Sequence, residues 1–197
     1  MVVTRSRQAN IIITGTPGTG KSSHTAALLE ALPHLKIVDV NALAKEKKLY
    51  AGFDEERQCH IVDDERLVDE LDDELDAGNQ VIDWHVCDVF PEECIDLVVV
   101  LRARNDVLYD RLKAREYDQK KIDENIDAEI MEVILNDAHE SYDKDIIVEL
   151  PSNEIEDIHS NVSRLVEWYN NWTDEHPEGI PLIECGADES SDSDVAE

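Results

Sequence analysis

The most informative stretch of the chain is Gly15-Thr16-Pro17-Gly18-Thr19-Gly20-Lys21-Ser22, which matches the pattern of a phosphate-binding loop. It follows the apolar run Ile11-Ile12-Ile13, which is typical of a strand, and it leads into residues 21–30, which are typical of a helix. Strand, glycine turn and helix are the context that this motif needs. The plainer alternative is a glycine-rich turn with a solvated lysine, and the flanking elements argue against it. The sequence therefore predicts nucleotide binding.

The residue types in this loop suit a polyphosphate. Glycines allow a tight turn and let backbone N–H groups approach phosphate without side chains in the way, while the helix N-terminus adds partial positive charge. Lys21 can reach the β and γ phosphates, and the Ser22 hydroxyl can complete a magnesium shell. The loop residues expected to hold ATP with Mg²⁺ are Gly15, Gly18, Thr19, Gly20, Lys21 and Ser22.

Short apolar runs alternate with longer amphipathic stretches to about residue 175, which is typical of βαβ units on a parallel sheet. We expect an α/β domain with five parallel strands flanked by helices. Asn41 and Asn105 are candidate N-caps, and Gly78 suits a helix end. The expected strands are 10–14, 36–40, 81–84, 97–102 and 146–150, and the expected helices begin near Lys21, Asn41, Asp63, Asp106, Asp118 (to about Ser141) and Glu154 (to about Glu175).

Composition limits the range of partners. The chain carries 18 basic and 47 acidic side chains, a net charge of −29, which disfavours an extensive nucleic-acid surface and favours a basic protein partner. The plainer alternative is that acidity serves solubility. No apolar run reaches bilayer length, so we expect no membrane partner. Four scattered cysteines favour reduced thiols, and the acidic segment from Pro177 onward is expected to be disordered.

A second group of candidate site residues, Asp83 and His85, lies at the end of the strand expected at residues 81–84. The carboxyl edge of a parallel sheet gathers ligands, so Asp83 is the candidate for holding magnesium through water. An N-cap role for Asp83 is the alternative. His85 lies two residues further on, on the same side of an extended chain, so it can also face the phosphates. A strand-end histidine of this kind is often only structural.

A third cluster surrounds Arg115, where one polar helix ends and another begins. A helix, a break and a helix form a hinged cover, and phosphate transfer needs water excluded and negative charge compensated. Arg115 is the candidate cation for the ATP phosphates, and Arg111, one turn earlier, is the weaker one. Pairing with the abundant surface acids is the alternative for both.

Four segments together resemble the adenylate kinase isoenzyme 6 family, also called nuclear adenylate kinases or Fap7-type ATPases. They are GTPGTGKSS, DWHVCD followed by VFPE, LVVVLRARNDVLYDRL and KIDENIDAEIMEV, within a similarity covering about residues 10–175. The resemblance implies a P-loop NTPase of the nucleoside monophosphate kinase-like kind, with a short lid. It divides the chain into an N-terminal arm (1–9), a kinase-like domain (10–176, with an NMP-binding region at about 39–62 and a lid at about 114–124) and an acidic disordered tail (177–197).

The same resemblance implies an activity and a setting. Family members combine ATP:AMP phosphotransfer with ATP hydrolysis, and they act in maturation of the small ribosomal subunit. There they bind a basic ribosomal protein of the platform, and thus the pre-ribosome indirectly, which places this chain in nucleus and cytoplasm. The family's functional positions fall on Gly18, Gly20, Lys21, Ser22 and Ser23, on Asp83 as the magnesium-linked acid, on His85, and on the lid residue Arg115.

The acceptor region departs from the family pattern. Asn41 and Lys45 are the candidates for binding AMP or another nucleoside monophosphate, but several relatives carry arginine where Lys45 stands. Lysine lacks the bidentate fork of arginine, and the short lid offers few further cations. We therefore expect weak transfer with measurable hydrolysis. The rival interpretation is an ATP-switched assembly factor that uses only the hydrolysis, and a third is a kinase for a shikimate-like or gluconate-like acceptor.

Overall fold

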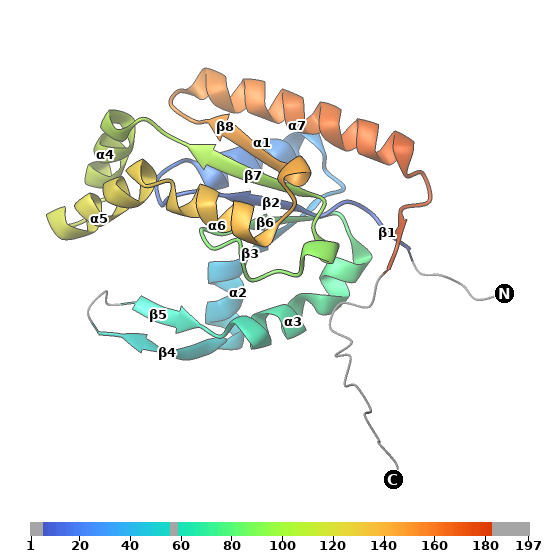
Figure 1. The fold of residues 1–197 in the computed structure, drawn as a ribbon, viewed down its shortest axis with the longest axis horizontal. Coiled ribbons are helices and arrows are strands. Elements are labelled where there is room, and N and C mark those ends of the chain that lie inside the picture. The colour runs from blue at the N-terminus through green and yellow to red at the C-terminus, as the bar shows by residue number, and fades with distance from the viewer. Residues whose placement is uncertain (1–5, 56–58, 183–197) are drawn as a thin grey trace, which may run out of the picture.

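The computed structural model describes residues 6–55 and 59–182 and folds them as an α/β domain around one central sheet (Figure 1). The sheet has five strands in the order β3-β6-β2-β7-β8, and every neighbouring pair is parallel. The prediction of five parallel strands is confirmed, with each end within one residue of its expected place. The strands are β2 Ile11–Thr14, β3 Lys36–Asp39, β6 Gln80–Asp83, β7 Leu97–Arg102 and β8 Ile147–Pro151.

Helices cover both faces of the sheet (Figure 1). On one face Ile11 and Ile13 pack with α1 and α7, whose contributions include Leu165 and Trp172. On the other face Ile12 packs in a core shared with α2, α3 and α6. Neighbouring residues of a strand point to opposite faces, which is why β2 is apolar throughout its first three positions. The helices are α1 Lys21–Ala31, α2 Val40–Lys47, α3 Asp64–Ala77, α4 Asn105–Ala114, α5 Gln119–Ile130, α6 Val133–Ser141 and α7 Ile155–Glu175, with short 3-10 turns at Glu92–Cys94 and Lys144–Ile146.

The helical pair α4 and α5 stands at the carboxyl end of β7 and has a small core of its own, which includes Leu108, Leu112 and Ile122. The single helix expected from Asp118 to about Ser141 is wrong. The chain breaks after α5 because Glu132 adopts a left-handed backbone conformation, with φ of 56°, and α6 then starts in a new direction.

Three local expectations concern helix ends. Asp39, and not Asn41, caps α2, since its carboxylate accepts a hydrogen bond from the Ala42 N–H at 3.0 Å. Asn105 is the first residue of α4 and not its cap, because Arg104 occupies that position. Gly78 ends α3 as predicted, with φ of 72°.

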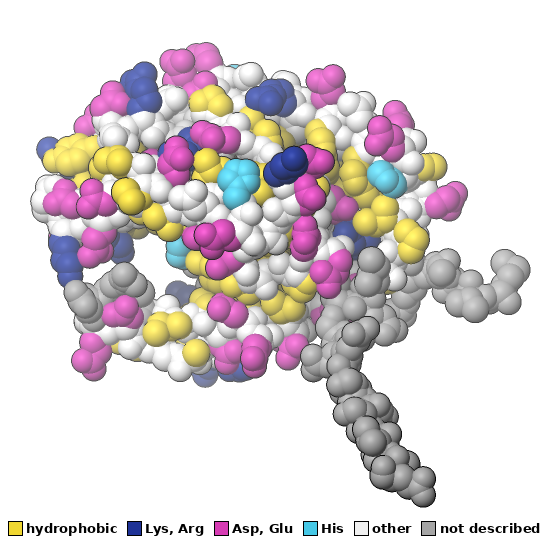
Figure 2. Space-filling view, in the orientation of Figure 1, with side chains coloured by type: hydrophobic (Ala, Val, Ile, Leu, Met, Phe, Trp, Pro, Cys, Tyr) yellow, Lys and Arg dark blue, Asp and Glu magenta, His cyan; other side chains and the backbone are white. Residues whose placement is uncertain are grey.

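A two-stranded antiparallel hairpin, β4 Tyr50–Asp54 with β5 Cys59–Val62, follows α2 and was not expected. The β4 sequence contains Gly52 and its residues are largely exposed, so no apolar alternation marks it. Figure 2 shows the surface hollowed between this hairpin and the α4–α5 side of the molecule. The hollow lies on the side to which the arrow of β7 points in Figure 1.

The described chain ends lie side by side, because β1 Ser6–Arg7 pairs with β9 Ile180–Pro181. The expectation of disorder from Pro177 is therefore wrong for the stretch that forms β9, and residues 183–197 lie outside the described part. The expectation of reduced thiols is wrong for Cys94, which is disulfide-bonded, whereas Cys87 is a buried free thiol. None of the helices in residues 6–55 and 59–182 is long and apolar enough to cross a membrane.

Candidate functional site

The phosphate loop joins the carboxyl end of β2 to the amino end of α1. Gly15, Gly18 and Gly20 have φ of 140°, 101° and 95°, which L side chains rarely adopt. A Cβ on Gly15 would also lie 2.5 Å from the carbonyl oxygen of Leu101. Gly20 is the N-cap of α1, and no side chain caps that end. The loop therefore presents backbone N–H groups at a helix N-terminus, as an anion site requires.

Side chains within the loop hold its shape. The Thr19 hydroxyl donates to the carbonyl oxygen of Thr16 at 2.9 Å, and the Thr19 N–H donates to the same oxygen at 3.1 Å, so both groups of Thr19 are used inside the loop. Ser23 lies exposed on the first turn of α1, where its N–H bonds to the Gly20 carbonyl. The predicted loop residues are thus gathered in one place, with Thr19 serving mainly the loop itself.

Lys21 lies across the mouth of this loop. Its Nζ donates to the carbonyl oxygen of Gly15 at 2.7 Å and to that of Thr16 at 3.4 Å. Desolvation lowers the pKa of Lys21 to about 8, opposed by the charge of Asp83 and reinforced by that of Arg115. These electrostatic contributions place Asp83 and Arg115 near the same ammonium group, as the sequence predicted.

Asp83 ends β6, the strand next to β2. Its side chain is 9 % exposed. Burial raises its pKa, while a hydrogen bond from Ser22 and the charge of Lys21 act in the opposite direction. Hydroxyl and carboxylate oxygens beside a phosphate loop fit magnesium, which takes one or two protein ligands and keeps waters in its remaining positions. Ser22 and Asp83 are therefore the described residues that could hold that ion.

His85 follows Asp83 and lies within reach of the charge of Lys21. Its surface is accessible, yet surrounding protein atoms desolvate the ring, and this burial and then the Lys21 charge lower its pKa to about 4. Both causes disfavour the cation, so the imidazole is neutral at pH 7. A neutral ring beside the phosphates can exchange hydrogen bonds but does not neutralise their charge.

The two arginines of α4 have different surroundings. Arg111 donates to the carbonyl oxygens of Ser152 at 2.8 Å, Asn153 at 3.0 Å and Gly18 at 3.4 Å, so it ties the lid base to the loop. Arg115 caps the end of α4, is exposed, and its charge acts on both Lys21 and Arg111. Arg115 is therefore the lid cation able to turn toward a ligand.

Within residues 6–55 and 59–182, no hydrogen bond or ion pair joins the two acceptor candidates to the phosphate loop. Asn41 and Lys45 are exposed on α2. The link between α2 and the site runs through Asp39, whose charge raises the pKa of its sheet neighbour Asp83. The acceptor role of Asn41 and Lys45 stays a prediction.

Sequence reasoning missed a buried acid. Glu129 of α5 is 3 % exposed and accepts a hydrogen bond from the hydroxyl of Thr16 in the phosphate loop. A signal was available, because Ile122, Ile126 and Glu129 follow the i, i+4, i+7 spacing of a buried helix face. An acid on such a face needs an internal partner.

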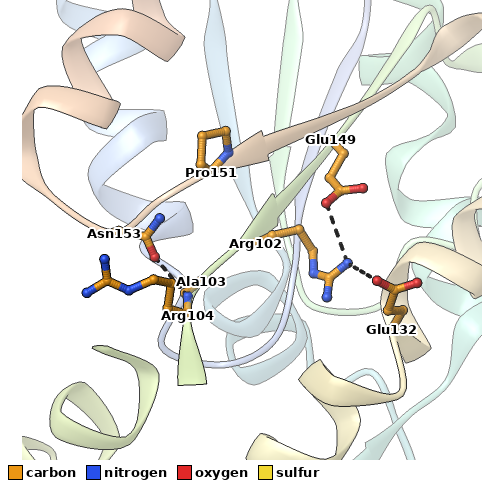
Figure 3. Close-up of a pocket in the computed structure, with 7 residues that line it drawn as sticks. All are labelled: Arg102, Ala103, Arg104, Glu132, Glu149, Pro151 and Asn153. Carbon is orange, nitrogen blue, oxygen red and sulfur yellow. Dashed lines mark hydrogen bonds and ion pairs between the residues drawn. The ribbon is translucent and has the colours of Figure 1, made fainter. Parts of the chain in front are cut away.

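A cavity of about 290 Å³ opens beside the site, at the ends of β7 and β8 (Figure 3). Arg102 points across it toward Glu132 at 3.2 Å and Glu149 at 3.6 Å. No residue of the phosphate loop lines it. Its walls are formed by Arg102, Ala103, Arg104, Glu132, Glu149, Pro151 and Asn153.

The chain resembles known proteins in sequence and in fold. A family model described as an AAA domain matches residues 11–132. The chain is 52 % identical to adenylate kinase isoenzyme 6 homolog FAP7 of Saccharomyces cerevisiae, over 87 % of each chain. It is 45 % identical to the homolog HBR1 of Candida albicans, over 90 % of this chain and 75 % of the other. A shikimate kinase from Bacteroides thetaiotaomicron has a similar fold, with a TM-score of 0.52 at 19 % identity, covering 82 % of this chain and 98 % of that one.

Proposed function

The chain belongs to the adenylate kinase isoenzyme 6 family, and from that membership we propose that it transfers the γ-phosphate of ATP to AMP and, without an acceptor, to water. Family and fold support a P-loop nucleotide kinase. The observation that carries the proposal further is that Asp83, at the end of the neighbouring strand β6, bonds to Ser22, and that the charges of Asp83 and Arg115 both act on Lys21.

Each residue has a role in such a transfer. The loop amides and Lys21 bind the phosphates, and Arg115 adds positive charge from the lid. Magnesium, held by Ser22 directly and by Asp83 through water, would neutralise charge on the phosphate oxygens. Neutral His85 donates or accepts a hydrogen bond near the transferring group. Asn41 and Lys45, on α2, bind the acceptor phosphate.

The proposal is tested by measuring ADP formation from Mg-ATP with and without AMP. Adding AMP should raise the rate and yield two ADP per ATP consumed, because acceptor and donor both become ADP. CMP and the deoxy monophosphates, run in parallel, rank the acceptors. Equal rates with and without every acceptor would reject the kinase and leave only an ATPase.

A second candidate function is favoured by the charge of the chain. We propose that ATP binding and hydrolysis also control how tightly the chain binds a basic ribosomal protein of the small-subunit platform. This binding would take place in nucleus and cytoplasm, during 18S rRNA processing. Its support is the net charge of −29. Acidic side chains are spread widely over the face shown in Figure 2. Such a field speeds the encounter with a cationic partner.

This partner proposal predicts binding that weakens with salt. A purified basic platform protein should be captured by the chain at about 50 mM salt and released steeply as salt rises, because screening shortens the range of the attraction. Capture should also differ between ATP, ADP and no nucleotide. A basic protein of equal charge and unrelated fold is the control. No capture at low salt, or equal capture of both proteins, would count against the partner role.

A further inference from the structure

A buried contact joins the phosphate loop to the helix that follows the lid. Thr16 is 2 % exposed, and its hydroxyl donates to Oε2 of Glu129. The carbonyl oxygen of Thr16 in turn accepts hydrogen bonds from the N–H of Thr19 at 3.1 Å and from its hydroxyl at 2.9 Å, and it lies 3.4 Å from the Nζ of Lys21. Glu129 therefore touches the residue around which the loop is folded.

The carboxylate of Glu129 is itself held firmly. Its Oε1 accepts from the Nε of Arg102 at 2.8 Å and from the backbone N–H of Ala103 at 3.0 Å. A second nitrogen of Arg102 donates to the backbone oxygen of Glu129 at 2.9 Å. A buried carboxylate with this many donors is fixed in orientation, and charge-assisted hydrogen bonds are the stronger kind. Its contact with Thr16 is therefore made from a rigid base.

Glu129 stands near the carboxyl end of α5, the helix that follows the lid. It lies next to the last residue of α5, just before the left-handed Glu132. The other end of α5 follows the lid break at Arg115, whose charge acts on Lys21. The carboxyl end of α5 is thus held at the phosphate loop.

We propose that Glu129 is a positioning residue for the bound nucleotide. Its carboxylate holds Thr16, and through Thr16 the loop carbonyls that meet Lys21, in the shape that accepts phosphates. Glu129 itself does not contact the phosphates. The inference rests on the proposed use of the loop for ATP, and it is independent of which acceptor the enzyme uses.

Thr16→Val tests the contact with little change of shape. Calorimetric titration with a magnesium-bound, non-hydrolysable ATP analogue should show affinity about tenfold weaker, because a buried charge-assisted hydrogen bond is lost. Thr16→Ser restores the hydroxyl and should recover most of the affinity. Glu129→Gln keeps the size and removes the charge, and it should also weaken binding. The double variant Thr16→Val, Glu129→Gln should lose less than the product of the single losses, because both act on one bond.

Glu132→Gln is the matched control. Glu132 pairs with the same arginine but is 52 % exposed, so affinity should stay within about twofold of wild type. Melting temperatures without nucleotide separate folding from positioning. Lower melting temperatures with unchanged affinity in the Thr16 and Glu129 variants would overturn the proposal, as would losses that multiply in the double variant. If the wild type binds the analogue but shows no AMP-dependent transfer, only the proposed transfer of phosphate to AMP is rejected. If the wild type does not bind the analogue, both the assignment of the loop to ATP and this inference are overturned.

Discussion

Replacing Lys21 by alanine is expected to lower kcat/KM for ATP by about 10³-fold, because a preorganised cation at the transferring phosphate is among the largest single contributions to such a reaction. The wild-type Nζ already lies 2.7 Å from the Gly15 carbonyl oxygen, at the mouth of the loop. Arg111 does not take its place, because it is bound to backbone carbonyls, and Arg115 lies at the end of α4 rather than in the loop. Coupled measurement of ADP production checks the effect.

The role of Lys21 has a second readout in the pH profile of the wild type. Free Lys21 has a pKa of about 8, below its ordinary value because of burial. Phosphate binding favours the charged ammonium, so wild-type kcat/KM should be level below pH 8 and fall as pH rises through it. Lys21→Arg keeps its charge throughout and, even if slow, should lack this decline. A wild-type profile level to pH 10, or near-normal turnover by the alanine variant, would contradict the assigned role.

Local sequence rules are enough to predict much of this candidate site. The glycine pattern places the loop because its backbone demands are met within eight neighbouring residues. Asp83 follows from the rule that ligands gather at the carboxyl ends of parallel strands. Both predictions use only short stretches of sequence, together with a sheet whose strands can be recognised from their apolar runs.

Contacts between distant segments could not be recovered in this way. Arg111 and Arg115 are one helical turn apart and look alike in the sequence, and only the carbonyls of Ser152 and Asn153 distinguish them. Glu129 reaches Thr16 across 113 positions of chain. The helix spacing marks Glu129 as buried, but its partner depends on how α5 packs.

The β4–β5 hairpin and the break after α5 were missed for a different reason. Glu132 adopts a left-handed conformation that is usually found at glycine or asparagine, so its residue type does not predict the break. The hairpin buries little of its own side-chain surface, so its strands leave no apolar period. In both places packing overrides what the local residue types favour.

Asp83→Asn is expected to lower kcat/KM for Mg-ATP by about 100-fold. Losses of this size are found when a residue that orients a bound metal indirectly, such as through water, is replaced. Asparagine keeps an oxygen that can accept the hydrogen bond from the Ser22 hydroxyl, so the fold and the shape of the loop should be unchanged. It removes the negative charge that supports the charged form of Lys21. The magnesium concentration giving half-maximal rate should rise in parallel, whereas ATP affinity measured without magnesium should hold or increase, because one repulsive charge is gone.

Asp88→Asn is the control for this last change. Asp88 follows the same strand, but its charge acts on Cys87, Asp137 and Tyr142 rather than on Lys21. Its magnesium dependence should match wild type. If Asp83→Asn likewise left the magnesium dependence unmoved while slowing turnover, the acid would serve only to hold Lys21 and Ser22, and the metal would be held by the phosphates and the Ser22 hydroxyl alone.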